Sequence, residues 1–395
     1  MKSALDNIRV LDLTRVLAGP YATMLLADLG ADVIKIEMPG SGDDSRHFGP
    51  YVNNESAYFM AINRNKRSMT LNLKNESGKE IFLELIKKTD VLVENFRPGT
   101  MEKLSLGYDK LIALNPKLIY AAASGYGHTG PYSQRAAYDA VVQAMGGIMS
   151  ITGEKDGKPM RVGTSIGDIA AGLFTTIGIL SALISRNSSG KGQMVDVAML
   201  DCQVAMLENA IARYFVTGEV PRPYGNRHTS IVPFEAFDTS DGEIMVAAGN
   251  NALWRKLCNI LNCSELIDDE RFKDNSDRNE NYDELRPLIA ARFLTKTTIE
   301  WQGILDDEGI PNGPINTIDK VVNNIQVLAR DMIVDVYHPL AKNFKMPGIP
   351  IKLSETPGSI RTPSPTLGQH TKEILKECLG FDDEAIEKLA EGGAI

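Results

Sequence analysis

A long uncharged run in the middle of the chain limits what the protein can fold into. From Ile169 to Ser185 no residue carries a charge, and Arg186 with the turn residues NSSGKG ends the run. A run of this length needs either a membrane or a protein core around it. Because Gly, Thr and Ser interrupt it and it stands alone, we expect a buried helix of a globular core.

One acid, Asp168, stands directly in front of this run, within RVGTSIGDIAAG. We expect Asp168 to be the N-terminal residue of the buried helix. There its carboxylate would accept backbone N–H bonds and lie at the positive end of the helix dipole. A simple helix cap accounts for such an Asp as well, so its role has to be judged from the rest of the chain.

Length, charge and cysteine content exclude several classes of protein. A chain of 395 residues predicts two domains. The net charge of −9, spread without long blocks of one sign, argues against nucleic acid as the main partner. The N-terminus lacks the pattern of a signal or transit peptide. We expect a cytoplasmic protein, without membrane or metal, whose scattered thiols stay reduced: Cys202, Cys258, Cys263 and Cys378.

The first half of the chain alternates predicted strands and helices. A strand at Ile8–Leu13, a helix at Tyr21–Leu29 and a strand at Ala31–Glu37 form one parallel βαβ unit. Further strands follow at Met69–Leu73, Val91–Phe96, Lys117–Ser124 and Gln193–Met199. This alternation predicts an α/β fold with a doubly wound, Rossmann-like sheet, whose ligands lie beyond the carboxyl ends of the strands.

The second half has a different texture. A Pro-, Gly- and Arg-rich stretch follows the second long helix, and a predicted β-hairpin turns at Ser240-Asp241-Gly242. We therefore predict a large domain over 1–205 that is completed by 331–395. A linker at 206–227 would lead to a small α+β domain at 228–330.

Three short motifs could bind phosphates or a purine. Gly125–Gly130 spells G-x-G-x-x-G after a strand, but Pro131 follows where a helix should begin, so a glycine-rich turn is favoured over a dinucleotide site. The run Asn63–Ser68 carries three cations and is either a solvated loop or a phosphate contact. Asn95–Thr100 offers an aromatic ring and a guanidinium for stacking on a purine, or simply a Pro-Gly turn.

Several stretches together resemble the family III CoA-transferases, the group of formyl-CoA transferase and carnitine CoA-transferase. The matching stretches are LDLTRVLAGPYATMLLADLGADVIKIE, NRNKRSMTLNLK, VLVENFRPGTMEKL, SGYGHTGPYSQRAAYDAV and GDIAAG. Within the family, DLTRVLAGP, RHTSIVPFEAF and AAGNN are most similar to the succinyl-CoA:dicarboxylate branch. The resemblance implies an interlocked homodimer, each chain with a large Rossmann-like domain and a small one.

The resemblance also implies a catalytic role for Asp168. Its carboxylate would attack the donor thioester, and the thiolate would return to give an aspartyl-CoA thioester that the acceptor acid attacks. The substrates would be an acyl-CoA, such as succinyl-CoA, and a small carboxylic acid, with no prosthetic group. The loop Ala248, Gly249 and Asn250 is similar to a mobile loop that covers the aspartyl intermediate, although only one glycine remains in it.

Contacts to CoA are implied at positions along the first third of the chain. They carry over to Val16, Leu17, Ala18, Leu71, Asn72, Leu73, Lys74, Asn95, Phe96, Arg97, Lys103, Tyr138 and Asp139. Some relatives have a basic residue where Met38 or Ala136 stands here, so Lys74, Arg97, Lys103 or the Asn63–Ser68 run would hold the phosphates instead.

The acceptor and the reaction type leave alternatives open. A dicarboxylate needs a cation for its second carboxylate, and Arg15 is the first candidate and Arg46 the second. Arg15 paired with a structural acid such as Asp12 is the alternative. A 2-methylacyl-CoA racemase of the same family would need a base where Tyr138 stands, and a phenol is a poor base near neutral pH. A CoA-binding protein without catalysis is the third alternative.

Overall fold

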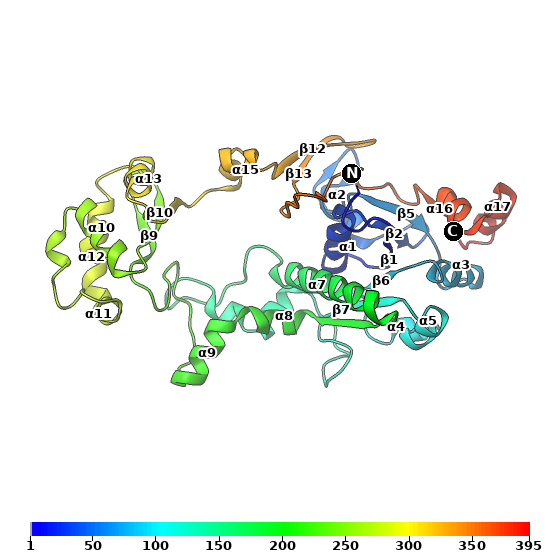
Figure 1. Cartoon of the computed structure of the whole chain (residues 1–395), viewed down its shortest axis with the longest axis horizontal. Coiled ribbons are helices and arrows are strands. Elements are labelled where there is room, and N and C mark those ends of the chain that lie inside the picture. Colours follow the sequence, from blue (N-terminus) through cyan, green and yellow to red (C-terminus); the bar gives the residue numbers. More distant parts are fainter. Residues whose placement is uncertain (1) are drawn as a thin grey trace. The chain divides into compact units, whose positions relative to one another are not determined.

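The protein is described here by a computed structural model that covers residues 2–395 and divides into two compact units. Both can be followed by colour in Figure 1. The first unit contains the residues up to Met149, Arg161–Glu219 and Gln326–Ile395. The second unit contains Ser150–Met160 and Val220–Ile325.

This division differs from the expected domains in three places. Residues 326–330, expected in the small domain, belong to the first unit. Ser150–Met160, expected in the large domain, belongs to the second unit. The expected linker at 206–227 begins with a helix of the first unit, α9 (Glu208–Thr217). The second long helix, expected over residues 200–215, is in fact two helices. The helical conformation is interrupted at Leu207, between α8 (Met199–Met206) and α9.

The first unit is built on a six-stranded parallel sheet in the order β5-β2-β1-β6-β7-β8. Its strands are β1 (Arg9–Asp12), β2 (Asp32–Glu37), β5 (Lys66–Thr70), β6 (Val91–Glu94), β7 (Ile119–Ser124) and β8 (Met194–Ala198). This is the expected Rossmann-like order, in which the chain moves outward from β1 in one direction and then from β6 in the other. The ligand site of such a sheet lies where the order reverses, between β1 and β6.

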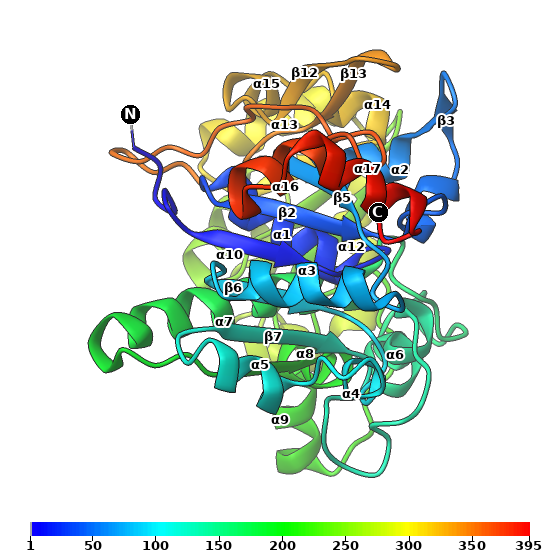
Figure 2. The same cartoon turned by 90° about the vertical axis from the view of Figure 1, so that its right-hand side faces the viewer.

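Helices cover both faces of this sheet. Val10, Val33 and Val91 point to one face, where they pack with residues of α1 (Ala18–Asp28) and α7 (Ile166–Ser189). The alternate strand residues, such as Leu11 and Ile34, point to the other face, which is covered by α3 (Glu76–Ile86), α5 (Tyr108–Leu114) and α16 (Thr371–Leu379). Figure 2 shows these three helices in front of the strands. Both faces are therefore buried, as in other parallel sheets.

A glycine lets α1 and α7 approach each other closely. A Cβ atom at Gly172 would lie 2.8 Å from the carbonyl oxygen of Ala18 and 3.0 Å from Cδ1 of Tyr21. Both distances are shorter than van der Waals contact, so a side chain at this position would push the helices apart. Gly172 lies about one helical turn beyond Asp168 and thus sets how near Asp168 comes to the start of α1.

The helix α7 is buried on one face only. It is long and apolar enough to cross a membrane by length and composition, yet half of its apolar 18-residue window is buried inside the protein. Ala170, Thr175 and Ile179 face the core, whereas the side chains of Ile177 and Ile184 are 57% and 71% exposed. The sequence predicted a buried helix, and this second, exposed apolar face is a departure from that expectation.

The second unit is a small α+β structure. An antiparallel sheet of β9 (Phe234–Asp238), β10 (Glu243–Ala247) and β11 (Asn312–Pro314) includes the predicted hairpin, with Thr239 N–H bonded to the Gly242 carbonyl. Phe237, Trp254 and Trp301 form its core. Its helices are α10 (Asn251–Ile260), α11 (Asn275–Glu280), α12 (Tyr282–Phe293), α13 (Thr298–Asp307), α14 (Ile318–Val321) and the short η3 (Ser264–Leu266).

Short elements connect or extend these two units. They are η1 (Asp44–His47), β3 (Tyr51–Val52), β4 (Glu55–Ser56), α2 (Ala57–Ile62), α4 (Thr100–Lys103), α6 (Asp139–Met145), η2 (Ile148–Ile151), α15 (Ile325–Ala329), β12 (Ile333–His338), β13 (Lys342–Pro347) and α17 (Asp383–Glu391).

Candidate functional site

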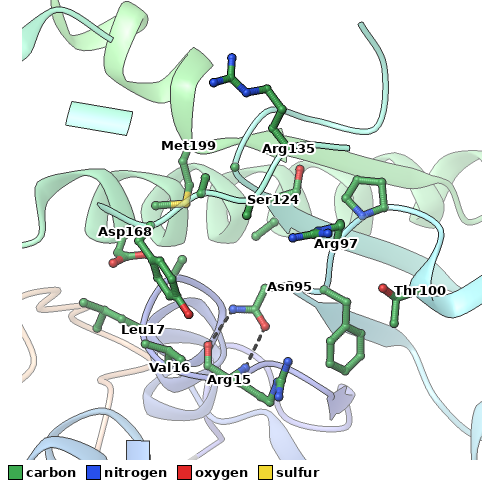
Figure 3. A pocket seen from close by; sticks show the side chains of 18 of the residues that line it. Arg15, Val16, Leu17, Asn95, Arg97, Thr100, Ser124, Arg135, Asp168 and Met199 are labelled. Atoms are coloured by element: carbon green, nitrogen blue, oxygen red, sulfur yellow. Dashed lines mark hydrogen bonds between the residues drawn. The ribbon is translucent and has the colours of Figure 1, made fainter. Parts of the chain in front are cut away.

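A cavity of about 390 Å³ lies at the carboxyl ends of β1, β6 and β7, where the strand order reverses. Figure 3 shows its lining. Of the residues predicted from the sequence, the cavity brings together Arg15, Val16, Leu17, Ala18, Asn95, Phe96, Arg97, Tyr138 and Asp168. Ser124, Arg135 and Met199 also line it and were not predicted.

Asn95 joins the loops that follow β1 and β6. Its Oδ1 accepts the backbone N–H of Arg15 at 2.8 Å, and its Nδ2 donates to the Arg15 carbonyl at 2.7 Å (Figure 3). The two loops therefore form one wall of the cavity. Next to Asn95, the N–H of Phe96 donates to the buried carboxylate of Glu94 at 2.7 Å, and burial raises the pKa of Glu94 to about 7.

The loop after β1 holds a strained residue. Val16 has φ +69°, a conformation that a β-branched residue rarely adopts. Its N–H donates to Oδ1 of Asp43 at 3.1 Å, and Asp43 is itself held by Lys35 at 2.8 Å. Burial alone would raise the pKa of Asp43, but Lys35 and the N–H groups of Ser45 and Val16 outweigh it and hold that pKa far below its ordinary value.

A second buried ion pair stabilises the two ends of the loop between β1 and α1. Lys66 contacts Asp12 at 3.0 Å, with both side chains fully buried, and also donates to the carbonyl of Pro20 in α1. Burial lowers the pKa of Lys66 to about 8, although Asp12 opposes this shift. Removing one partner of such a pair leaves a buried charge unpaired, which costs about 3–5 kcal/mol.

Asp168 lies at the cavity as the third residue of α7, with Ser165 as N-cap. The expected hydrogen bonds from the helix N-terminus to its carboxylate do not occur among the described residues. The nearby N–H of Gly167 donates instead to Oδ1 of Asp139 at 2.9 Å. Burial, and then the charge of Asp139, raise the pKa of Asp168 to about 7. This is opposite to the effect of a helix cap, so the capping prediction for Asp168 was wrong.

Asp139 lies outside the lining of this cavity, and its side chain accepts the backbone N–H of Gly167. It is the first residue of α6 and is 8% exposed. Its Oδ2 accepts a bond from Nε2 of Gln143 at 2.8 Å, and Oε1 of Gln143 accepts the N–H of Val162 at 2.9 Å. Together, the two side chains hold the segment that leads into α7. The resemblance had implied a CoA contact for Asp139, and its side chain lies elsewhere.

Tyr58 was missed by the sequence analysis. It lies on α2, half-buried, with its ring 5.7 Å from that of Phe48. Burial, followed by the charges of Asp168, Asp43 and Asp139, raises the pKa of Tyr58 to about 12. The phenol therefore keeps its proton and is a hydrogen-bond donor in the field of Asp168. No motif around Tyr58 distinguishes it, because its proximity depends on the tertiary fold.

A second cavity of about 540 Å³ adjoins the first and shares Arg15, Asp44, Phe96 and Thr100 with it. Apolar side chains form part of its wall, and two lysines join Arg15 in its lining: Ile36, Met38, Leu71, Leu73 and Leu104, with Lys74 and Lys103. An apolar slot beside lysines suits a purine with phosphates. Asn72, also predicted to contact CoA, is not part of this lining, and its N–H donates to the Ala394 carbonyl at 2.8 Å.

The two arginines predicted for an acceptor carboxylate differ in availability. Arg46 donates to both oxygens of Glu37 at 2.7 Å and lies 3.7 Å above the ring of Phe59, so its guanidinium is occupied. Arg15 is half exposed in the cavity. It lies 3.3 Å from Asp44, rather than from Asp12, and 5.4 Å from the ring of Phe96.

The basic run at 63–68 is also occupied by structural contacts. Arg64 pairs with the buried Asp28 at 2.7 Å, and Lys66 pairs with Asp12. Arg67 contacts Asp32 at 2.7 Å. These cations stabilise the sheet and line neither cavity, so the structure assigns no phosphate contact to them.

The remaining predicted residues are not part of the lining of either cavity. Ala248 and Gly249 follow β10 in the second unit, and Asn250 caps α10 by accepting the N–H of Leu253 at 2.9 Å. Within residues 2–395, no cluster of three or more His, Cys, Asp or Glu side chains is placed to hold a metal ion.

Comparison with known proteins gives consistent matches over nearly the whole chain. The profile of CoA-transferase family III matches residues 5–371. Mouse (Mus musculus) succinyl-CoA:glutarate CoA-transferase is 45% identical over 99% of this chain and 90% of its own length. The acetyl-CoA:oxalate CoA-transferase of Acetobacter aceti is 42% identical over 95% and 96%. A crystal structure of a CAIB/BAIF family protein from Brucella suis, 40% identical, superimposes with a TM-score of 0.85 over 96% of this chain and 100% of that chain.

Proposed function

Because the chain belongs to CoA-transferase family III, we propose that it moves CoA from succinyl-CoA to a free dicarboxylic acid through covalent intermediates on Asp168. The observation that carries this proposal is the state of Asp168 itself. Its carboxylate lies at the cavity and receives no hydrogen bond from the described residues, so its lone pairs are free for attack.

The transfer would proceed in balanced steps. An oxygen of Asp168 attacks the thioester carbonyl carbon, the C–S bond breaks, and the thiolate leaves with the electron pair. The thiolate then attacks the Asp168 carbonyl of this anhydride and releases the donor acid. The acceptor carboxylate attacks the resulting aspartyl-CoA thioester, and a second thiolate return frees Asp168. Each step exchanges one acyl bond for another of similar energy, so no redox chemistry is needed.

The two adjoining cavities support a binding mode in which each cavity holds a different part of the CoA molecule. We place the adenosine part in the cavity that contains Lys74 and Lys103, and the thioester in the cavity that contains Asp168. Phe96 lines both and would lie where the two parts meet. Lysine side chains bind phosphates through their positive charge. Lys74 and Lys103 would therefore replace the basic side chains that some relatives have where Met38 and Ala136 stand here.

Arg15 remains our candidate for the second carboxylate of the acceptor. Its partner Asp44 is 56% exposed, so the ion pair is weak and exchangeable. A carboxylate held by a guanidinium with two parallel bonds would also have a fixed orientation. The mouse and Acetobacter relatives, a succinyl-CoA:glutarate and an acetyl-CoA:oxalate CoA-transferase, support a dicarboxylate as the acceptor here.

We further propose that two copies associate and that the enzyme works in the cytoplasm. The exposed apolar side chains of α7 and α9, such as Ile184 and Phe215, support an interface because such patches are rarely left to water. Four free cysteines support a reducing compartment.

The test combines two variants with a panel of acids. Asp168→Ala should abolish transfer from succinyl-CoA. In the wild-type protein treated with succinyl-CoA and hydroxylamine, mass spectrometry should find a hydroxamate on Asp168, because hydroxylamine attacks the activated Asp168 carbonyl and releases CoA or the donor acid. Retained turnover in a clean Asp168→Ala preparation would exclude the mechanism.

Acceptor preference is measured with glutarate, succinate and oxalate against monocarboxylates of matched length. Arg15→Leu should lose the preference for dicarboxylates, whereas Arg135→Leu should keep it. Arg135 is the matched control because it lines the same cavity, yet it stacks on Tyr132 and its guanidinium points away from Asp168 (Figure 3). Equal use of monocarboxylates by the wild type would refute the substrate assignment.

A further inference from the structure

Two carboxylates lie close together at the start of α7, and only one of them reaches the cavity. Asp168 lines the cavity, whereas Asp139 is buried behind it with Oδ1 on the N–H of Gly167. The contact leaves no room for a side chain at position 167. A Cβ there would lie 3.0 Å from Oδ1 of Asp139 and 2.9 Å from Val142. Asp139 is therefore held at a fixed place beside the residue that precedes Asp168.

Asp139 has hydrogen-bond donors but no cationic partner within residues 2–395. It accepts one bond from a backbone N–H and one from the amide of Gln143, and no cation contacts it among the described residues. By taking the Gly167 N–H, Asp139 also removes a donor that would otherwise stabilise the anionic Asp168 at the helix start. Both effects act in one direction, because they make the anionic form of Asp168 less stable.

Other titratable or charged side chains line the cavity from separate elements. They are Asp44 in η1, Tyr138 at the N-cap of α6, and Arg15, Arg97 and Arg135 in the loops. Tyr58 on α2 is outside this lining, but burial and then the nearby charge of Asp168 raise its pKa. Apart from burial, the charge that acts on Asp168 is that of Asp139. Tyr58 is neutral because its pKa is raised to about 12.

We propose that Asp139 is a positioning residue for the transfer, because it fixes the main chain at Gly167 and keeps a negative charge beside Asp168. The repulsion between the two carboxylates ends when Asp168 is acylated and loses its charge. The inference rests on the proposed role of Asp168 as nucleophile. In the attack, the Asp168 oxygen forms its bond to the acyl carbon and gives up its charge, while the thiolate leaves with the electron pair. The destabilised carboxylate thus reacts faster than a hydrogen-bonded one would.

The experiment follows acylation of Asp168 against pH, using rapid mixing with succinyl-CoA and mass spectrometry of the trapped peptide. Asp139→Asn keeps an oxygen for the Gly167 N–H and removes the charge. Gln143→Met is the matched control, because it removes the hydrogen bond to Asp139 without replacing the Asp139 carboxylate. Gln143→Lys is a second way to neutralise Asp139, needed if Asp139→Asn fails to fold.

In the wild type, acylation should rise with pH through a midpoint near 7. Asp139→Asn and Gln143→Lys should shift this midpoint to lower pH by one unit or more and lower the plateau rate at least threefold. Gln143→Met should keep the wild-type midpoint whatever its rate.

An unchanged midpoint in both neutralised variants would overturn the role of the charge, even if their rates fell. Absence of any acyl group on Asp168 in the wild type would instead refute the proposed function. The two failures are therefore distinguishable.

Discussion

Replacing Asp168, the proposed nucleophile, should make the protein more stable, and by an amount that depends on pH. In the folded protein the pKa of Asp168 is about 7 instead of its ordinary value of 3.8. Between these two values the unfolded chain releases a proton that the folded protein keeps. The folded state therefore loses stability as the pH rises through this window, and the loss is complete above pH 7.

The size of the effect follows from the shift. Each pKa unit corresponds to about 1.4 kcal/mol, so a rise of roughly three units gives a ceiling of about 4 kcal/mol. Asp168 is partly open to the cavity, and solvent there reduces the figure to about 2 kcal/mol. Asn resembles the neutral form of Asp and does not titrate, so Asp168→Asn does not lose unfolding free energy as the pH rises. Its gain in unfolding free energy should grow by about 1–3 kcal/mol between pH 5 and pH 8.

The assay is urea unfolding of wild type and Asp168→Asn at several pH values, compared through midpoints at equal slope. The same substitution in an Asp139→Asn background is the control, and there the gain at pH 8 should shrink. A gain that does not change with pH, or a less stable Asp168→Asn protein at pH 8, would show that Asp168 is not destabilised in the folded state.

Three further predictions concern other parts of the first unit. Lys66→Met should lower the unfolding free energy by about 3 kcal/mol, because it leaves the buried Asp12 without its contact at 3.0 Å; a loss below 1 kcal/mol in urea titration would contradict this. Lys103→Ala should raise the KM for succinyl-CoA severalfold without changing kcat, and should weaken the salt dependence of that KM; an unaltered KM would place the phosphates elsewhere. Sedimentation at micromolar concentration should give a dimer, which Ile177→Asp weakens because Ile177 is 57% exposed on α7; a wild-type monomer would exclude the interface.

The sequence predicted the sheet well because its signals are local. Apolar strands alternate with amphipathic helices, which predicts a parallel sheet. The carboxyl ends of parallel strands lie at the same edge of the sheet, so the residues that follow them come together there. This brought Asp168, Asn95 and Arg15 to one cavity. Capping preference, also a local signal, failed at Asp168, because the competing acceptor Asp139 comes from a separate helix.

Charge runs were less informative than hydrophobic patterns. Arg64, Lys66 and Arg67 stand together in the sequence, but each finds an acid from another segment: Asp28, Asp12 and Asp32. The partners of long cationic side chains depend on which acids the fold brings near, and this information is not in the spacing of the cations. The same holds for Arg46 on Glu37, which the sequence offered as free for a substrate.

The close approach at Gly172 has a consequence for engineering. The gap between Asp168 and the start of α1 depends on a hydrogen atom at position 172, outside the lining of either cavity. An alanine there would force α7 away from the Ala18 carbonyl by a few tenths of an ångström or more. Libraries that vary position 172, together with Tyr21 against which it packs, would change the breadth of the cavity while leaving its chemical groups intact. Acceptor size could then be selected separately from acceptor charge.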